Sequence, residues 1–381
     1  MLLLKRGDSM SLKILHTGDV HIGMKFNNYR KDIQQELIEA RFDVLNNIIS
    51  KANEENCNIL AIAGDLFDKH NIPQKSVIRV IDILDRFSGD CILILPGNHD
   101  FDNGAVELWE SFRSNMTGKM VLLDEFEEYD LTNFDIDAAV YPAHCDAKHS
   151  DSNNLDWIKN LEEKSDCKYK IGLAHGALSG LSPDMTDDYF KMDQDELDQL
   201  EMDIWLLGHT HVPYPEQEEV TNRYIYNSGT PEPDGLDCTH GGNVWLVEID
   251  EDKNVKAKSI TTGNYRFYDL EFNVESENDF EDIKDRFSAD DPSSKVVRLN
   301  LKGRIEEELY GKKEDFYKDL KDKLAYLLVD DNELKIKITK EVINDEFTPD
   351  SFPHQLLSEL EDDEKALQLA YEFIREVKEC D

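Results

Sequence analysis

The chain of 381 residues contains no hydrophobic run long enough to span a bilayer. Apolar stretches such as residues 92–95 and 204–207 are far shorter than the roughly 20 residues that a transmembrane helix needs. Its six cysteines form no Cys-x-x-Cys pair, so neither a zinc knuckle nor a disulfide framework is indicated. A Walker-type glycine-rich loop is also missing, and any use of ATP would therefore belong to a partner. We expect a cytoplasmic protein without a membrane segment.

Basic residues are scarce in this sequence. The 42 Lys and Arg residues face 82 Asp and Glu residues, which gives a formal net charge of −40. Such a charge keeps a protein soluble but makes it repel itself, and salt screens that repulsion, so a salt-rich cytoplasm would suit the chain. Because nucleic-acid affinity rests on Lys and Arg that neutralise phosphates, a polyanionic substrate would have to be held by local features.

The first 260 residues alternate β-branched runs with helical stretches. Residues 12–17 predict a strand, and residues 32–53 predict a helix because their apolar side chains recur at spacings of three and four. Further strands are expected at 58–63, 91–95, 138–141, 170–174, 203–207, 224–226 and 244–249, and further helices at 74–87 and 105–112. This order predicts an α/β fold in which two packed mixed sheets are flanked by helices.

A smaller α+β region is expected after a change of composition near residue 263. Its predicted elements are strands at 268–274, 295–301 and 333–340, helices at 279–287 and 314–328, and a last helix at 364–377 with one apolar face. The expected domains are residues 11–262, residues 263–345 and a C-terminal helical segment, residues 346–381. The last helix either packs on its own domain or docks a partner.

Five polar clusters follow predicted strands. They are Gly18-Asp19-Val20-His21, Gly64-Asp65-Leu66-Phe67-Asp68, Gly97-Asn98-His99-Asp100, Ala174-His175-Gly176 and Gly208-His209-Thr210-His211. Ligands of open α/β sheets bind at the carboxyl ends of the strands, where these clusters are expected. Two of the clusters place donor side chains two residues apart, so that both project to the same side of an extended backbone.

The candidate donors are carboxylate and amide oxygens and imidazoles, without a thiolate. This mixture suits Mn, Fe or Zn better than Ca or Mg. Seven donors are too many for one zinc ion and about right for two ions, and such a pair promotes in-line displacement at phosphorus. Each cluster alone is compatible with a simple turn or a solvated loop, but their joint occurrence predicts a phosphoester-hydrolysing centre.

The motifs in this order resemble the calcineurin-like metallophosphoesterase superfamily. Within it they are similar to the DNA-repair exonuclease branch, which comprises bacterial SbcD and the archaeal and eukaryotic meiotic-recombination-eleven nuclease. This resemblance implies a four-layer sandwich with a small capping domain. It also implies that one ion is held by Asp19, His21, Asp65 and His211, and the other by Asp65, Asn98, His175 and His209.

The resemblance assigns further roles around the two ions. It implies that His99 supports the leaving oxygen and that Asp100 orients His99, both as catalytic residues. Asp68 stands where some members of the branch carry a further histidine. Mn²⁺ is the expected metal, with Fe and Zn as alternatives.

Six basic residues near the motifs are candidate DNA contacts, although each is equally compatible with an ordinary surface charge. They are Lys25, Arg30, Lys31, Lys69, Lys75 and Arg79. The resemblance implies DNA as the substrate, an ATPase of the SbcC or Rad-fifty type as a partner, and a homodimer formed by the helices near residues 78–87 and 106–112. Core packing is the alternative for those two helices.

We therefore predict a two-metal DNA nuclease that hydrolyses phosphodiesters at DNA ends as the nuclease subunit of a double-strand-break repair complex. The alternatives are a metallophosphatase or cyclic-nucleotide phosphodiesterase that uses the same site, and a non-catalytic clamp that bridges DNA to a partner.

Overall fold

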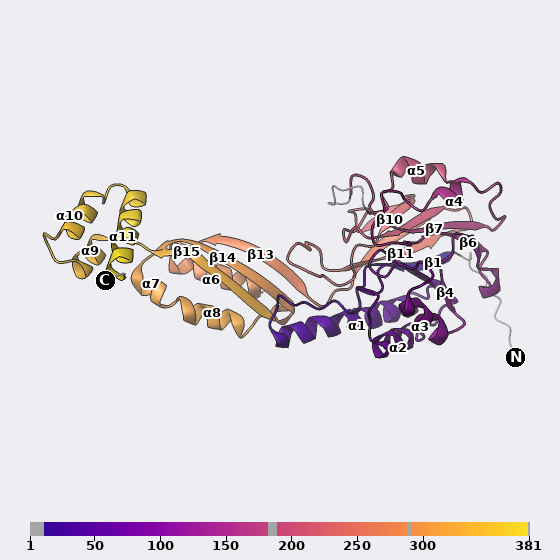
Figure 1. The fold of residues 1–381 in the computed structure, drawn as a ribbon, viewed down its shortest axis with the longest axis horizontal. Helices are drawn as coiled ribbons and strands as arrows, with labels where there is room; N and C mark the ends of the chain where they lie inside the picture. Colours follow the sequence, from indigo (N-terminus) through magenta and orange to yellow (C-terminus); the bar gives the residue numbers. More distant parts are fainter. Residues whose placement is uncertain (1–10, 182–188, 289–290, 380–381) are drawn as a thin grey trace. The chain divides into compact units, whose positions relative to one another are not determined.

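The computed structural model describes residues 11–181, 189–288 and 291–379. The chain divides into two compact units between Phe267 and Tyr268 (Figure 1). Within the described ranges, no helix is both long and apolar enough to cross a membrane.

The first unit contains a seven-stranded and a five-stranded sheet. The seven-stranded sheet has the order β4 (Met120–Leu122), β3 (Cys91–Leu95), β2 (Ile59–Ala63), β1 (Leu12–Thr17), β11 (Asn243–Ile249), β12 (Val255–Thr261) and β9 (Glu219–Thr221). The five-stranded sheet has the order β10 (Ile225–Asn227), β8 (Ile204–Gly208), β7 (Tyr169–His175), β6 (Ala138–Ala143) and β5 (Tyr129–Asp130). Strands β1 to β4 are mutually parallel, as are β6, β7, β8 and β10.

The two sheets pack face to face through a shared apolar core. That core joins Ile14 and Leu93 of the first sheet to Ile171 and Leu206 of the second, all fully buried. Strands β2 and β3 consist of five apolar residues each, and such uninterrupted runs are expected for sheets that are covered on both faces.

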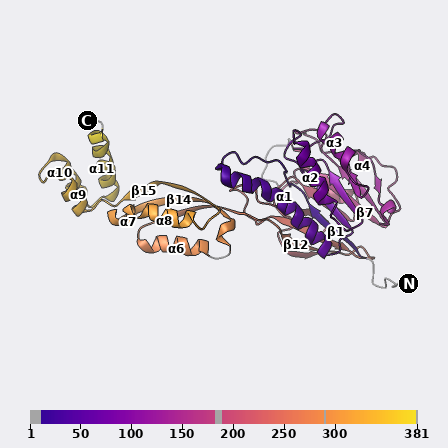
Figure 2. The ribbon, with the colours of Figure 1, turned by 90° about the horizontal axis from the view of Figure 1, so that it is seen from below.

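Helices cover the outer face of each sheet. On the seven-stranded sheet lie α1 (Lys31–Glu54), α2 (Gln74–Leu84) and α3 (Glu107–Asn115), and Figure 2 shows α1 and α2 across its strands. On the five-stranded sheet lie α4 (Asp156–Lys159) and α5 (Gln194–Gln199). The predicted α/β class, with packed sheets flanked by helices, is therefore confirmed. Trp109 and Phe112 of α3 are fully buried in the core beneath the helices.

The second unit is built on a three-stranded sheet in the order β13 (Arg266–Asn273), β14 (Lys295–Ile305) and β15 (Tyr326–Ile336). Its helices are α6 (Glu277–Ser288), α7 (Glu307–Gly311), α8 (Lys313–Lys321), α9 (Lys340–Glu346), α10 (Phe352–Glu359) and α11 (Glu364–Glu379). A short 3-10 helix lies at Pro292–Ser294, and another lies in the first unit at Thr132–Phe134.

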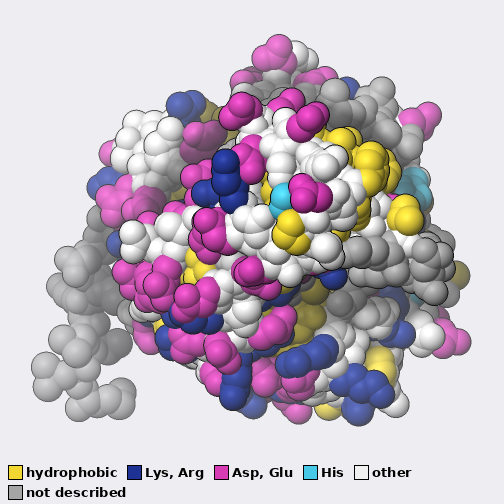
Figure 3. Space-filling model, turned by 90° about the vertical axis from the view of Figure 1, so that its left-hand side faces the viewer, with side chains coloured by type: hydrophobic (Ala, Val, Ile, Leu, Met, Phe, Trp, Pro, Cys, Tyr) yellow, Lys and Arg dark blue, Asp and Glu magenta, His cyan; other side chains and the backbone are white. Residues whose placement is uncertain are grey.

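Figure 3 shows Asp and Glu side chains spread over the face in view, with Lys and Arg scattered among them.

One predicted helix of this unit is too long. The expected helix at 314–328 ends at Lys321, and strand β15 already begins at Tyr326. Leu324 and Leu327 continue the helical spacing of apolar residues, but residues from Tyr326 onward pair in parallel with β14 from Val296 onward. The added pairing along the full length of β14 outweighs the local helical pattern.

We expect Gly172→Ala to destabilise the first unit. Gly172 of β7 pairs with Trp205 of β8, and a Cβ atom at residue 172 would lie 2.2 Å from the indole ring. Overpacking of this kind costs about 1–3 kcal/mol. The free energy of unfolding in urea measures the loss. Gly118→Ala is the matched control, because a Cβ atom at residue 118 would meet nothing within 4 Å. Equal stability of the two variants would contradict the packing described here.

Candidate metal centre

The five motifs converge where the two sheets expose the carboxyl ends of their parallel strands. Asp19 and Asp65 follow β1 and β2 of one sheet, whereas His175 ends β7 and His209 follows β8 of the other. Backbone hydrogen bonds join the first two loops, from the Asp19 amide to the Gly64 carbonyl (3.0 Å) and from the His21 amide to the Asp65 carbonyl (2.9 Å). The fold thus brings side chains from distant parts of the chain to one edge.

Most of the expected donors have left-handed backbone. The φ angles are +53° at Asp19, +51° at His21, +52° at Asp65, +97° at His209 and +54° at His211. This conformation is unfavourable for residues with a Cβ atom, and it persists only where the surroundings impose it. Five such residues at one place indicate that the surrounding structure imposes this backbone conformation and thereby directs the donor side chains toward one another.

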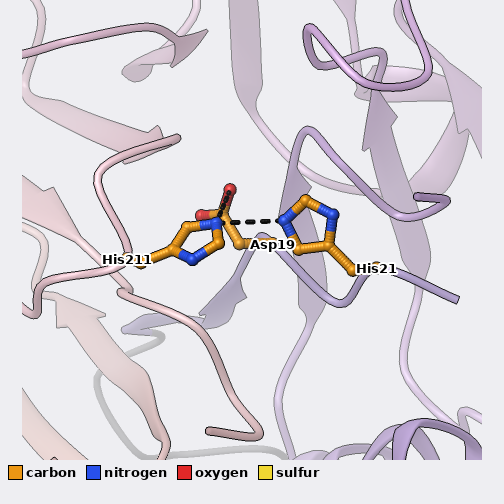
Figure 4. Close-up of side chains that lie close together, drawn as sticks. All are labelled: Asp19, His21 and His211. Atoms are coloured by element: carbon orange, nitrogen blue, oxygen red, sulfur yellow. Dashed lines mark hydrogen bonds and ion pairs between the residues drawn. The ribbon is translucent and has the colours of Figure 1, made fainter. Parts of the chain in front are cut away.

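Asp19, His21 and His211 form the first group of donors (Figure 4). The Nε2 atoms of His21 and His211 are 3.0 Å apart, and the Nε2 atom of His211 lies 3.6 Å from Oδ1 of Asp19. Asp19 and His21 are buried, and His211 is partly exposed.

Asn98, His175 and His209 form the second group together with Asp65. Oδ1 of Asn98 lies 2.9 Å from Nε2 of His175 and 3.1 Å from Nδ1 of His209. The Asp65 carboxylate lies between the two groups, with Oδ2 3.5 Å from Nε2 of His175 and 3.7 Å from Nε2 of His21. The structure therefore brings all seven expected donors together in two adjacent groups that meet at Asp65.

The spacing of these donors fits metal ions. Ligands bound at about 2.0–2.2 Å lie roughly 3–3.5 Å from one another around an ion. The separations of 3.0 Å between His21 and His211, and of 2.9 Å and 3.1 Å around Asn98, match that range. Nitrogen and oxygen donors without a thiolate suit first-row divalent metals.

Hydrogen bonds behind two imidazoles fix which nitrogen faces the centre. Nδ1 of His175 lies 2.8 Å from the Ala63 carbonyl, and Nδ1 of His211 lies 2.7 Å from Oδ2 of Asp234. In each ring the Nδ1–H group donates to that oxygen, so Nε2 is the nitrogen directed at the centre. Such outer partners set the tautomer and raise the basicity of a metal-binding histidine.

The ionisation of the centre reflects close packing of opposite charges. Burial lowers the pKa of His21 to about 3, and burial together with the nearby His175 lowers the pKa of His209 to about 4. Burial opposes the charge of His175, but the Asp65 carboxylate raises the pKa of His175 to about 9. Burial likewise opposes the charge of Asp65, yet the surrounding imidazoles lower the pKa of Asp65. Neutral His21 and His209 are in the form that binds metal.

Two motif glycines allow this close approach. Gly64 has a φ of +87°, and a Cβ atom there would lie 2.0 Å from Nδ1 of His175. A Cβ atom on Gly97 would lie 2.2 Å from Oδ1 of Asp65. A side chain at either position would push the donors apart.

His99 lies at the edge of the centre, beside the first donor group. Its backbone amide donates to Oδ1 of Asp65 (2.8 Å), and its Nδ1 atom lies 3.1 Å from the Asp68 carbonyl. Its ring packs edge-on against His21 with centroids 4.9 Å apart. His21, Asp68 and His99 also bring one possible ligand atom each within 4.8 Å of one another.

The expectation that the Asp100 carboxylate orients His99 disagrees with the contacts. The two carboxylate oxygens of Asp100 accept hydrogen bonds from the backbone amides of Phe67 (2.9 Å) and Gly97 (2.7 Å). Asp100 is fully buried, and its carbonyl accepts a hydrogen bond from the indole of Trp109. Asp100 therefore holds together the loops that carry Asp65 and Asn98, because its carboxylate is directed at their backbone amides instead of at the His99 ring.

Two of the six candidate DNA contacts lie beside the centre. Lys25 and Lys69 line a groove of about 600 Å³ whose walls also include Asp68 and Asp234. Nζ of Lys69 lies 3.6 Å from Oδ2 of Asp68 and pairs with it. The carboxylates of Asp68 and Asp234 neighbour His21 and His211 of the first donor group.

The other four basic candidates have ordinary surface surroundings. Arg30 pairs with Asp32 at 2.8 Å, and Arg79 pairs with Glu39 at 2.8 Å. These carboxylates partly neutralise both guanidinium groups. The remaining two are on exposed positions of α1 and α2, and they are Lys31 and Lys75.

Sequence reasoning missed Asp234 and Arg41. Asp234 holds His211, and although burial opposes the charge of Asp234, its hydrogen bond with that imidazole lowers the pKa of Asp234. Arg41 is fully buried on α1, and its guanidinium donates to the carbonyls of Glu232 (2.9 Å) and Pro233 (3.4 Å). Asp234 follows no predicted strand, and the apolar spacing around Arg41 only predicts a helix. The only sign of a special role for Arg41 in the sequence was a charged residue at an apolar position of that predicted helix.

The comparison with known families gives a match over most of the first unit. The family described as calcineurin-like phosphoesterase matches residues 12–213 of the chain. This chain belongs to that family. The family is one of phosphoesterases, and the converging carboxylates and imidazoles are the candidate metal ligands of this chain.

A curated relative matches about half of this chain. The uncharacterized metallophosphoesterase YhaO of Bacillus subtilis (strain 168) is 26% identical over 211 residues, which are 52% of this chain and 48% of the relative. The match therefore spans about half the length of that relative.

Solved structures similar to this metallophosphoesterase share little sequence with it. TT1561 of Thermus thermophilus matches with a TM-score of 0.37 at 11% identity, covering 66% of this chain and 100% of that protein. A dimetal phosphatase of Danio rerio matches with a TM-score of 0.32 at 12% identity, covering 67% and 100%. A purple acid phosphatase of yellow lupin (Lupinus luteus) matches with a TM-score of 0.36 at 16% identity, covering 68% and 55%.

We expect Asp234→Asn to weaken metal binding while the fold is retained. The amide oxygen of Asn can still accept a hydrogen bond from Nδ1–H of His211, but it carries no negative charge. Loss of an outer carboxylate typically costs 10–100-fold in metal affinity. Calorimetric titration of the metal-free protein with Mn²⁺ measures the change. Asp237→Asn, an exposed carboxylate in the same loop, is the control. Wild-type affinity in Asp234→Asn would show that the His211 contact does not support the centre.

Proposed function

We propose that this metallophosphoesterase is a two-metal DNA nuclease that hydrolyses phosphodiesters at DNA ends, and that it serves as the nuclease subunit of a double-strand-break repair complex. The observation that carries the proposal is the groove of about 600 Å³ that opens beside the donor groups and contains Lys25 and Lys69. A lone phosphate group would not need this space, whereas a nucleic-acid strand extends beyond the phosphate that is cut. The motif resemblance to the SbcD branch supports the same substrate.

The chain's own residues account for positioning in this reaction. Divalent ions, when bound, lower the pKa of a water molecule and neutralise charge on the phosphate. Asp65, placed between the two donor groups, keeps the groups at a fixed separation. Lys25 and Lys69 can contact phosphates next to the scissile one without reading sequence. We propose Mn²⁺ as the metal, because the donor set suits Mn, Fe or Zn and the resemblance favours Mn among them.

His99 is the proposed proton donor to the leaving sugar oxygen. Its Nδ1–H group faces the Asp68 carbonyl at 3.1 Å, which orients the ring and leaves Nε2 for the substrate. In the protonated ring, Nε2–H transfers its proton to the departing oxygen as the phosphorus–oxygen bond breaks, and the neutral ring remains. The side chain of His99 is partly exposed, so a substrate bound at the metal centre can reach it.

The proposed partner surface is the exposed face of α11. Leu369, Phe373 and Val377, spaced four residues apart on this helix, are 54%, 59% and 66% exposed. An apolar stripe of this kind is typical of helix docking. We propose that it binds an ATPase of the SbcC or Rad-fifty type and that two nuclease subunits associate in the complex. Co-purification of such an ATPase with the wild-type chain, and its loss with Phe373→Asp, tests the first proposal, and light scattering of the complex tests the second.

We expect His99→Ala to abolish hydrolysis while metal binding is kept. Loss of a positioned proton donor typically lowers the rate by 10²–10⁴-fold. Asp65→Ala should instead lose bound metal, because Asp65 contributes to both donor groups. Metal content by elemental analysis and cleavage of end-labelled linear duplex in Mn²⁺, Mg²⁺ and no metal measure the two effects across a salt series.

The same assay separates the proposal from its alternatives. Linear DNA is compared with a chromogenic phosphodiester, a phosphomonoester and a cyclic nucleotide as substrates. Hydrolysis of the small esters without cleavage of DNA would favour a phosphatase or cyclic-nucleotide phosphodiesterase. Complete inactivity in every metal, with DNA bridging that His99→Ala leaves intact, would favour a non-catalytic clamp. Wild-type rates in His99→Ala would contradict the role of His99.

A further inference from the structure

The groove beside the metal centre has a defined composition. One wall is the loop of residues 24–29 that follows the first motif, and another is the loop of residues 234–236. Asp68 and Lys69 complete the lining. We call this space the 24–29 groove. Its volume of about 600 Å³ falls within the ~300–1,000 Å³ typical of small-molecule sites.

The 24–29 groove borders the centre through residues that hold the donors. Asp234 accepts a hydrogen bond from Nδ1 of His211 (2.7 Å), and Oδ1 of Asp68 lies 3.9 Å from Nδ1 of His21. A molecule in this groove therefore lies next to the first donor group. A phosphate ester bound at the metal centre can extend one of its substituents into the groove.

The loop that forms the groove is well anchored. Nε2 of Gln34 on α1 donates to the Lys25 carbonyl (2.6 Å), and the Tyr29 amide donates to the Phe26 carbonyl (3.1 Å). Phe26 is buried with a φ of +48°, and its ring lies under the guanidinium of Arg41 at 5.6 Å. These contacts fix the loop before any ligand arrives, which reduces the entropy lost on binding.

The side chains in the groove offer three kinds of contact. Lys25 is exposed and has no carboxylate within ion-pair distance among the described residues, so it can meet a phosphate. Asn27 and Asn28 present amides that can both donate and accept hydrogen bonds. Tyr29 is half-buried and packs edge-on against Phe26 and Phe267, and its ring forms part of the groove lining. A phosphate contact, amides and an aromatic ring together match a nucleotide, because bases stack on aromatic rings and their edges bond to amides.

We infer that the 24–29 groove is a nucleotide subsite, which binds the base and sugar next to the scissile phosphate, with the base against Tyr29 and a neighbouring phosphate at Lys25. The inference rests on the proposed function for the identity of the polymer. Stacking on Tyr29 is tolerant of sequence, and the subsite accordingly holds any of the bases.

The test uses the Mn²⁺-loaded protein and measures binding of three probes by calorimetry. The probes are deoxyadenosine monophosphate, deoxyribose phosphate and inorganic phosphate. We expect the nucleotide to bind on the order of 10-fold tighter than either probe without a base, since stacking contributes that much per base. Tyr29→Leu should remove this preference, and Tyr29→Phe should keep it. Retention of the preference in Tyr29→Leu would overturn the role of Tyr29.

Charge is tested separately from stacking. Lys25→Glu should raise the KM for DNA, because a phosphate next to the scissile one binds at Lys25. Lys256→Glu is the matched control, since Lys256 is an exposed lysine on β12 away from the groove lining. An equal effect of the two substitutions would overturn the assignment of Lys25. Thermal unfolding of each variant confirms that the comparison is made on folded protein.

Failure of the subsite and failure of the proposed function give different results. If DNA is cleaved but the nucleotide binds no tighter than phosphate, the subsite is wrong and the nuclease stands. If the nucleotide is preferred and Tyr29→Leu removes the preference, but DNA is not cleaved, the subsite stands and the nuclease proposal is wrong.

Discussion

The carboxylate of Asp65 is the contact on which the centre depends. It is almost completely buried, it lies between His21 and His175 from different sheets, and its other oxygen accepts a hydrogen bond from the His99 amide. A buried carboxylate is costly unless cations or hydrogen bonds compensate it. In the metal-free protein, the raised pKa of His175 favours its protonated form, and the positive charge of that ring supplies part of the compensation. Two bound cations would supply it more completely, so metal binding and the stability of this edge are coupled.

Hydrogen bonds behind the donors hold the donor loops in place. Arg41 on α1 bonds to the Glu232 and Pro233 carbonyls, which precede Asp234, and to the Val20 carbonyl between two donors (3.4 Å). The hydroxyl of Thr230 donates to the Asp19 carbonyl at 3.0 Å. One buried guanidinium thus ties the first motif to the loop that orients His211. Since these bonds of Arg41 go to carbonyls, its position is set by the backbone of both loops.

The sequence pattern predicts the first unit better than the second, for physical reasons. Buried parallel strands such as β2 and β3 are uninterrupted apolar runs, and the motifs follow them directly, so both the sheets and the donor loops could be located. The helix predicted at 314–328 failed because pairing with β14 decides the state of residues 326–328. The short strands β4 and β9 have three residues each and lack a pattern of their own.

Roles that depend on contacts between distant residues could not be predicted from the sequence. Asp100 stands beside His99 in the chain, yet its carboxylate bonds to the amides of Phe67 and Gly97, because it is directed into the protein beneath the motif loops. Asp234 is 23 residues from His211, and no spacing relates the two. The motifs identify which side chains meet at the centre, whereas the partners that fix those side chains come from the packing of the loops.

The acidic surface and an anionic substrate are compatible because positive charge is concentrated at one place. With a net charge of −40, the chain as a whole repels nucleic acid, and its surface arginines Arg30 and Arg79 already pair with carboxylates. Two divalent ions would add four positive charges at the donors, next to Lys25 and Lys69 in the groove. Salt weakens attraction between exposed charges far more than contacts in a partly buried site. For the proposed nuclease, a substrate would therefore be held at the metal centre and repelled elsewhere, which would favour short engagement of DNA ends over coating of the duplex.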